Sequence, residues 1–213
     1  MFKESFHMLL IEAVLFFLAI IGWGIVPRIE LLIMASFFAG IMVFTIFFFR
    51  DPKRKVATGN NIIVSPADGR VVHIGDIPHF SLSTGSVKVI TIYLSLWNVH
   101  VNRVPISGQV TYLDHQQGCF YPAFNNRSSK KNEYTVIGIT GEMGKVFIKQ
   151  IAGTFARRIV CRLQIDEQVR QGERFGMIKF GSRIELYLPY SVVLKVFVGD
   201  RIRGGESIIA EKT

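Results

Sequence analysis

The residues best suited to unusual chemistry in this chain are Gly181 and Ser182, which lie between two apolar, strand-like segments. Glycine adopts backbone conformations that other residues avoid, so a tight turn here can leave the Gly181 carbonyl strained and exposed. The Ser182 hydroxyl could attack that carbonyl, given a base and an oxyanion donor. A serine that cuts its own backbone can end as an N-terminal pyruvoyl group, which is a cofactor made from the chain. Most Gly-Ser pairs are ordinary hairpin turns, so this interpretation depends on other motifs.

Two further motifs combine turn residues with side chains that can hold or transfer a proton. Asp68 lies in the sequence SPADG (65–69), and His100 lies in NVHVNR (98–103), just after a strand-like run. Asp before Gly is a common turn pair, so Asp68 alone indicates little more than a turn. His100 alternates with apolar neighbours, which makes it either a buried, satisfied side chain or one directed into a site.

The sequence does not predict a metal site. The histidines beyond the N-terminal region are scattered and form no HxH or HExxH motif, and the two cysteines form no CxxC pair. These residues are His73, His79, His100, His115, Cys119 and Cys161. We expect the cysteines to be reduced, unpaired thiols that serve as small apolar core residues.

The elements that must position these motifs begin with two hydrophobic runs. Leu9–Val26 contains one charged residue, Glu12, and Leu31–Phe49 contains none. Each run would form a helix of about 27 Å, which is close to the hydrocarbon thickness of a bilayer. Only residues 27–30 separate the runs, so they predict a membrane-anchoring helical hairpin (residues 1–55) before a second domain (residues 56–213). Whether the hairpin spans the bilayer or dips into one leaflet is left open.

Charge predicts which side of the membrane the second domain occupies. A basic cluster follows the second run at once, and such a cluster favours the cytoplasmic face and anionic lipid headgroups. It consists of Arg50, Lys53, Arg54 and Lys55. The net charge of +9 could also suit nucleic acid, but the remaining basic residues are scattered among strand-like segments. Anionic membrane lipid is therefore the predicted partner, and nucleic acid is not.

Beyond residue 56 the sequence is mainly β. Short apolar or alternating segments are separated by Gly, Pro, Asn and Asp, which is typical of a β-rich barrel or sandwich. The expected strands are 62–65, 69–74, 87–94, 108–113, 135–140, 145–151, 159–163, 177–180, 184–188 and 193–196.

A faint internal repeat supports this fold class. Residues 166–173 and 200–206 share the pattern D-x-(x)-[VI]-R-x-G-E. The pattern resembles the hammerhead half-motifs of lipoyl and biotinyl domains. A carrier domain would present a modified lysine at a hairpin tip, and the only candidate, Lys179, lies in the wrong context. The repeat therefore predicts lipoyl-like barrel geometry more than a carrier function.

Taken together, the motifs resemble phosphatidylserine decarboxylase, specifically its short bacterial and archaeal form. The resemblance covers nearly the whole chain and rests on several segments in a fixed order. These are FFRDP (48–52), SPADG (65–69), NVHVNR (98–103), QIAG (150–153), ARRIVC (156–161) and RFGMIKFGSR (174–183).

The resemblance implies a proenzyme that cleaves itself between Gly181 and Ser182 into fragments 1–181 and 182–213, which stay together as a heterodimer. Ser182 would become a pyruvoyl group that forms a Schiff base with phosphatidylserine and yields phosphatidylethanolamine. Asp68 and His100 match family residues that assist maturation and catalysis. The long form has a second histidine where this chain has Arg103, and Gly-Ser-Thr where this chain has Arg183 after Ser182, so the base that activates Ser182 is open. A higher homo-oligomer is also open.

Two other interpretations remain at this point. The same chemistry could act on an ether-linked archaetidylserine lipid. A non-enzymatic, membrane-anchored adaptor of lipoyl-like fold would explain the hairpin and the repeat, but not Asp68, His100 and Gly181-Ser182 together. An intact-mass measurement separates the enzyme from the adaptor, because an adaptor has no reason to become two fragments.

Overall fold

The computed structural model describes residues 3–82, 85–119, 121, 131–153, 159–178 and 182–212 of the chain. The chain divides into two compact units, residues 1–52 and 53–213. Each unit is described by itself.

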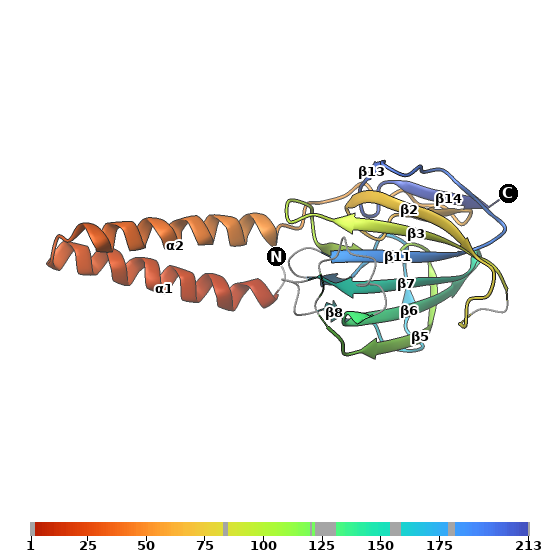
Figure 1. Ribbon diagram of the computed structural model, residues 1–213, viewed down its shortest axis with the longest axis horizontal. Helices are drawn as coiled ribbons and strands as arrows, with labels where there is room; N and C mark the ends of the chain where they lie inside the picture. Colours follow the sequence, from red (N-terminus) through yellow and green to blue (C-terminus); the bar gives the residue numbers. More distant parts are fainter. Residues whose placement is uncertain are drawn as a thin grey trace. The chain divides into compact units, whose positions relative to one another are not determined.

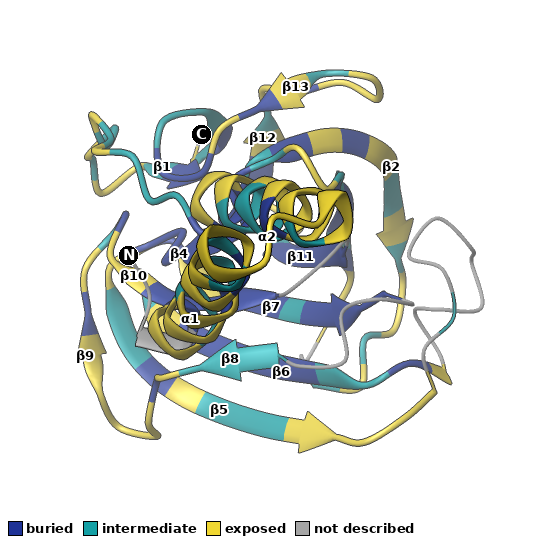
Figure 2. Cartoon of the chain, turned by 90° about the vertical axis from the view of Figure 1, so that its left-hand side faces the viewer, coloured by how far each residue is buried: buried dark blue, intermediate teal, exposed yellow. Residues whose placement is uncertain are grey.

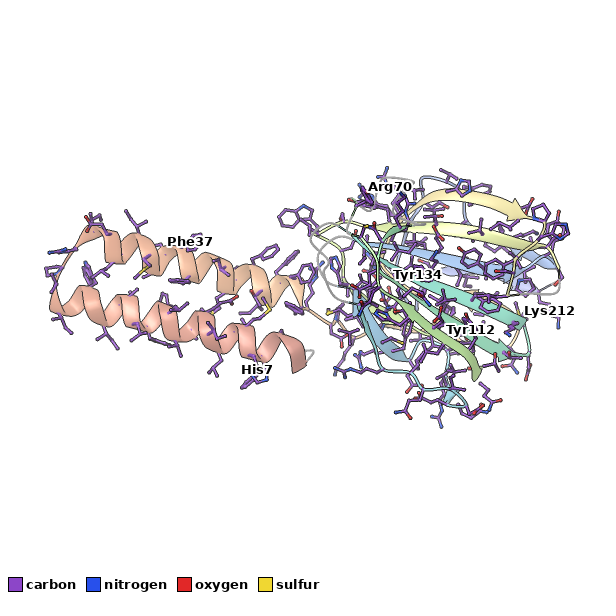
Figure 3. All side chains as sticks on the ribbon, turned by 60° about the horizontal axis from the view of Figure 1, so that its bottom comes forward. His7, Phe37, Arg70, Tyr112, Tyr134 and Lys212 are labelled. Atoms are coloured by element: carbon purple, nitrogen blue, oxygen red, sulfur yellow. The ribbon has the colours of Figure 1, made fainter. Side chains whose placement is uncertain are left out.

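The first unit is a hairpin of two apolar helices, as predicted: α1 (Lys3–Ile25) and α2 (Ile29–Phe48). Both helices are long and apolar enough to cross a bilayer, and few of their residues are buried. Phe37, for example, projects outward from α2 (Figure 3). The charged residue Glu12 is buried between the helices, where the Thr45 hydroxyl donates a 2.8 Å hydrogen bond to it. The connection is shorter than expected, because α2 already begins at Ile29.

The second unit is built almost entirely from antiparallel strands, which confirms the predicted mainly-β class (Figure 1). Its strands are β1 (Ile62–Val64), β2 (Gly69–Ile77), β3 (Val87–Leu94), β4 (Val101–Arg103), β5 (Gly108–Gln116), β6 (Tyr134–Gly141), β7 (Gly144–Ala152), β8 (Ile159–Cys161), β9 (Gln168–Val169), β10 (Arg174–Ile178), β11 (Ser182–Pro189), β12 (Val192–Leu194), β13 (Arg201–Ile202) and β14 (Ile208–Lys212). Each of the ten expected segments overlaps a strand. The sequence missed β4, β9, β13 and β14.

The topology of this unit is duplicated. The large curled sheet has the order β13-β2-β3-β11-β7-β6-β5-β9, and two small sheets have the orders β1-β14-β12 and β4-β10-β8. All three orders are reproduced when each strand is exchanged with its counterpart: β1 with β4, β2 with β5, β3 with β6, β7 with β11, β8 with β12, β9 with β13 and β10 with β14. The continuous stretch β4–β10 is therefore one copy, and it is inserted between β3 and β11 of the other copy.

The repeated sequence pattern marks equivalent turns of the two copies. Gly172 and Gly205 both have a positive φ, 80° and 79°, which favours glycine. The Gly172 N–H donates to the Val104 carbonyl, and the Gly205 N–H donates to the Ser65 carbonyl. Two short strands follow the same rule, because β9 pairs with the start of β5 and β13 pairs with the start of β2. The expectation of lipoyl-like hammerhead elements agrees with this arrangement.

Side chains pack against both faces of the large sheet at its centre. The inner face packs against the two small sheets and forms the main core, to which β11 contributes Ile184 and Leu186. On the outer face, Phe80 stacks on Tyr187 with ring centroids 4.4 Å apart and closes a smaller aromatic cluster. Figure 2 shows β7 and β11, the two central strands, buried along most of their length. A strand held on both sides and both faces is firmly fixed, and Ser182 is the first residue of such a strand.

Candidate active site

The inserted copy brings two distant parts of the sequence to one end of the large sheet. The chain leaves the first copy at Leu94 and returns to it at Ser182, and these two residues are paired on β3 and β11. The inserted copy begins at Val101 and nears its end at Met177, and these residues are paired on β4 and β10. The chain crosses between the copies twice, at residues 94–101 and at residues 177–182. The two crossings have paired residues at both of their ends. His100 lies at the end of the first crossing.

Ser182 is fully buried at the start of β11. It alternates with Ile184 and Leu186, so its side chain belongs to the inner face of the sheet. Its Oγ has no hydrogen-bond partner among the described residues. A buried hydroxyl without a partner costs folding free energy, so it calls for a functional explanation.

The strands on either side of the Gly181-Ser182 bond belong to different sheets. β10 pairs with β4 and β8, whereas β11 pairs with β3 and β7. The chain therefore passes from a small sheet to the large sheet between these strands, because one copy of the fold ends there and the other resumes. Gly181, and with it the expected strain at its carbonyl, lies outside the described residues.

His100 is fully buried and held by the turn before it. Its Nδ1 lies 2.9 Å from the Asn98 carbonyl oxygen. Because a carbonyl only accepts hydrogen bonds, we assign the proton to Nδ1, which leaves the lone pair on Nε2. The turn itself is closed by Asn98 Oδ1, which accepts hydrogen bonds from the Ser95 N–H and the Ser95 hydroxyl at 2.9 and 2.7 Å. In this tautomer the imidazole can accept a proton at Nε2.

A buried amide pair lies next to these residues and was not predicted as part of a site. Gln150 Nε2 donates a 2.7 Å hydrogen bond to Asn102 Oδ1, and both residues are fully buried. Gln150 is the next inward-facing residue after Ala152, which is paired with Ser182. Asn102 Nδ2 and Gln150 Oε1 have no partner among the described residues. If both amides were turned over, one donor and one acceptor would still remain.

Asp68 is engaged in the structure of its turn. Its Oδ2 forms a 2.6 Å ion pair with Arg54, and its Oδ1 accepts a 2.8 Å hydrogen bond from the Gly204 N–H. In the other copy the Ser107 hydroxyl accepts a 3.0 Å hydrogen bond from the Gln171 N–H in the equivalent place. Arg54 is largely buried in this pair, so its predicted role as part of a lipid-facing basic cluster is wrong.

The two departures from the long form occupy different environments. Arg103 is buried, and its Nη1 donates a 2.9 Å hydrogen bond to the Gly172 carbonyl in a hammerhead turn. Arg183 follows Ser182 and therefore belongs to the opposite, outer face of the sheet. Burial lowers the pKa of Arg183, and the charge of nearby Glu185 opposes that shift.

A cavity of about 750 Å³ adjoins this end of the sheet. Asp68, Ser95, Trp97 and Asn98 line it, together with arginines from β2 and β13. Ser182 and His100 are not among its lining residues, although Asn98 binds His100 and Ser95 directly follows the partner of Ser182.

The two cysteines lie in different environments. Both are free thiols, as expected. Cys161 is half-buried in β8, whereas Cys119 is exposed. The prediction that both are core residues is therefore wrong for Cys119, which lies in a loop after β5 and not in a strand.

Comparison with known proteins gives a consistent result. Residues 41–210 match the family model described as phosphatidylserine decarboxylase. The phosphatidylserine decarboxylase proenzyme of Wolbachia pipientis wMel is 47% identical over 77% of this chain and 74% of that protein. The proenzymes of Chlorobium phaeovibrioides and Chlorobium luteolum are 45% and 41% identical, over 79% and 86% of this chain and 77% and 86% of those proteins.

Proposed function

The chain belongs to the phosphatidylserine decarboxylase family, and on this basis we propose that it converts phosphatidylserine to phosphatidylethanolamine with a pyruvoyl group formed from Ser182. One observation carries the proposal. The hydroxyl of Ser182 is fully buried without a partner among the described residues, at the point where the two copies of the fold meet. A hydroxyl that served the fold would be hydrogen-bonded, as the Ser107 hydroxyl is.

The proposed maturation uses only groups of the chain and one water. Ser182 Oγ attacks the Gly181 carbonyl carbon, the peptide C–N bond breaks, and an ester with a free amine at residue 182 forms. Elimination then breaks the Cβ–O bond, releases the Gly181 carboxylate and leaves dehydroalanine. Its imine tautomer reacts with water, which releases ammonia and leaves the pyruvoyl carbonyl. One water is consumed and one ammonia is released.

The surrounding residues suit this chemistry. His100 Nε2 is the proposed acceptor of the Ser182 proton, because Nδ1 is engaged by the Asn98 carbonyl. The open donor and acceptor of the Asn102–Gln150 pair are the proposed stabilisers of charge that develops beside residue 182. A pyruvoyl group at residue 182 would supply the electron sink for loss of the substrate carboxylate. Arg103 is assigned to the fold, because its guanidinium holds a turn.

The two fragments, 1–181 and 182–213, are expected to remain one body as a heterodimer. The smaller fragment would begin with β11, which pairs with β3 over eight residues and with β7 over six. Strands β12, β13 and β14 would also stay paired, β13 with β2 and β14 with β1. Cleavage at the end of such a strand leaves these hydrogen bonds in place.

We place the protein at the cell membrane, with the β domain on the cytoplasmic side. The apolar, largely exposed surfaces of α1 and α2 support membrane association, and the basic residues Lys53 and Lys55 after α2 favour this side. The substrate lies in the bilayer, so an anchored enzyme can reach the headgroup without extracting the lipid.

Intact-mass analysis of the purified chain tests the proposal. We expect one fragment that ends at Gly181 and one that begins at residue 182. When phosphatidylserine and borohydride are added together, we expect the second fragment to carry a stable, reduced adduct. Ser182→Ala should remain one polypeptide of 24.1 kDa without activity. Two fragments from that variant, or a wild-type chain that never divides, would disprove the proposal.

A further inference from the structure

Two arginines lie directly opposite each other at the edge of the large sheet. Arg70 on β2 is paired in register with Arg201 on β13, and both are exposed. Neither forms an ion pair with any residue that the structure describes. Like charges directly opposite on neighbouring strands destabilise a sheet, so this pair costs folding free energy.

The duplicated fold shows that the arginines are not needed at this position. The equivalent of Gly69 paired with Ile202 is Gly108 paired with Val169. The next pair in the inserted copy is Gln109 with Gln168, in the place of Arg70 with Arg201. The same backbone arrangement is thus formed by an uncharged pair. The arginines must be explained by something other than the fold.

Both arginines line the 750 Å³ cavity beside the candidate active site. The volume lies within the range of small-ligand sites. Figure 3 shows Arg70 near the end of the sheet where β2 begins. The acid in the cavity, Asp68, is already held by Arg54 and the Gly204 N–H, so it does not neutralise the arginine pair. Trp97 lies at the rim with 69% of its surface exposed.

We propose that Arg70 and Arg201 bind the phosphate of the lipid headgroup and so hold the substrate beside residue 182; this inference rests on the proposed function. Arginine guanidinium groups match phosphate oxygens in geometry as well as charge. In the substrate, the carbon that carries the amine lies three bonds from phosphorus, so a phosphate site must lie next to the reacting residue. Ser95, which follows the strand partner of Ser182, and Asn98, which binds His100, both line the cavity.

The first test measures binding without turnover. The chain has two tryptophans, so the full-length Trp23→Phe/Ser182→Ala variant in neutral detergent keeps only Trp97 as a fluorescent reporter at the cavity. We expect glycerophosphoserine to change the Trp97 emission with saturation. Adding Arg70→Gln and Arg201→Gln, which copies the glutamine pair of the other half, should weaken binding at least about ten-fold.

Inorganic phosphate and L-serine identify what the arginines recognise. Serine alone should cause no saturable change in Trp97 emission, and phosphate should bind more weakly than glycerophosphoserine does. If phosphate binds as tightly as glycerophosphoserine, the ligand is a free phosphate and the assignment to the lipid is wrong. If glycerophosphoserine causes no saturable change, or binds the glutamine variant equally well, the subsite is overturned. These readouts do not depend on cleavage, so they stand apart from failure of the proposed function.

The second test uses the cleaved enzyme and a matched charge swap. The Arg70→Gln/Arg201→Gln variant should raise KM for phosphatidylserine at least about ten-fold and change kcat much less. Adding Gln109→Arg and Gln168→Arg restores the net charge at the equivalent place of the other copy. We expect this swap not to lower KM. Recovery of KM by the swap would show that overall charge, and not this subsite, attracts the lipid.

Discussion

Asp68 and Ser107 perform the same structural task in the two copies of the fold: each accepts a backbone N–H from the hammerhead turn that packs against it. They differ in one respect, because Asp68 also binds Arg54 through its second oxygen. Asp68 therefore has two roles. It accepts a hydrogen bond that holds the turn, which a hydroxyl could also do, and it carries a negative charge, which a hydroxyl could not supply. The two roles can be separated by substitution.

Asp68→Ser is expected to fold and to cleave itself at least about ten-fold more slowly than the wild type. The new hydroxyl can accept a hydrogen bond from the Gly204 N–H, as the Ser107 hydroxyl does from the Gln171 N–H, while the carboxylate that lines the cavity with Asn98 is lost. Thermal unfolding and a time course of fragment formation measure the two effects. Ser107→Ala is the matched control and should cleave normally. A folded Asp68→Ser chain that cleaves at the wild-type rate would assign Asp68 to the fold alone.

Gln150→Leu is expected to destabilise the β domain by about 1–3 kcal/mol, because it leaves the buried Asn102 amide without its partner. Replacing both residues with apolar side chains, as in Asn102→Leu/Gln150→Leu, should recover part of that stability. Self-cleavage should stay slow in both variants, because Gln150→Leu removes the open acceptor Oε1 and the double variant also removes the open donor of Asn102. Urea unfolding and fragment formation are measured on the same samples. If the double variant regains normal cleavage, the pair has no role beyond packing.

His100→Ala is expected to abolish decarboxylation and to slow self-cleavage. The substitution removes the Nε2 lone pair while the Ser95–Asn98 turn keeps its own hydrogen bonds. Release of carbon dioxide from phosphatidylserine and the fraction of cleaved chain are the two readouts. Full turnover by this variant would remove His100 from the mechanism.

The two thiols should differ in reactivity. Burial raises the pKa of the Cys161 thiol, whereas Cys119 is exposed. At pH 8 iodoacetamide should modify Cys119 first, and Cys119→Ser should react much more slowly, with a rate that rises as the pH increases. Because the folded pKa of Cys161 is raised, its contribution to stability is complete below the unfolded thiol pKa and is lost at higher pH. Equal labelling of both cysteines would contradict this assignment.

Removal of residues 1–50 is expected to leave self-cleavage intact and to weaken membrane association. These residues hold both apolar helices, and the β domain forms a compact unit of its own. Flotation with phosphatidylglycerol-containing vesicles compares the truncated and full-length chains. Unchanged flotation would show that the hairpin is not the main anchor.

The sequence predicts those features that depend on local pattern. The helices follow from two uninterrupted apolar runs, and the longer strands follow from alternation bounded by turn residues. Strands β9 and β13 have two residues each, which is too short for any periodic signal. The sequence shows the repeated hammerhead pattern. It does not show that one copy is inserted into the other, because equivalent positions such as Arg70 and Gln109 differ chemically.

The candidate site follows the same division. Ser182, Asp68 and His100 stand in recognisable motifs, so their positions could be identified. The Asn102–Gln150 hydrogen bond joins residues 48 positions apart, and no single motif contains both. The role of Asp68 in holding its turn can be recognised only by comparison with Ser107 in the other copy. The signal in the sequence is that Asp68 and Ser107 both stand directly before a glycine, Gly69 and Gly108.

The position of β11 between β3 and β7 has a consequence for the life of each molecule under the proposed function. A carbonyl created at the head of a strand in mid-sheet cannot be exchanged, since removing it would require the domain to unfold. Each molecule would therefore carry a single, irreplaceable reactive group for as long as it exists. Chemical damage to that group would inactivate the molecule irreversibly, and activity could be restored only by synthesis of new protein.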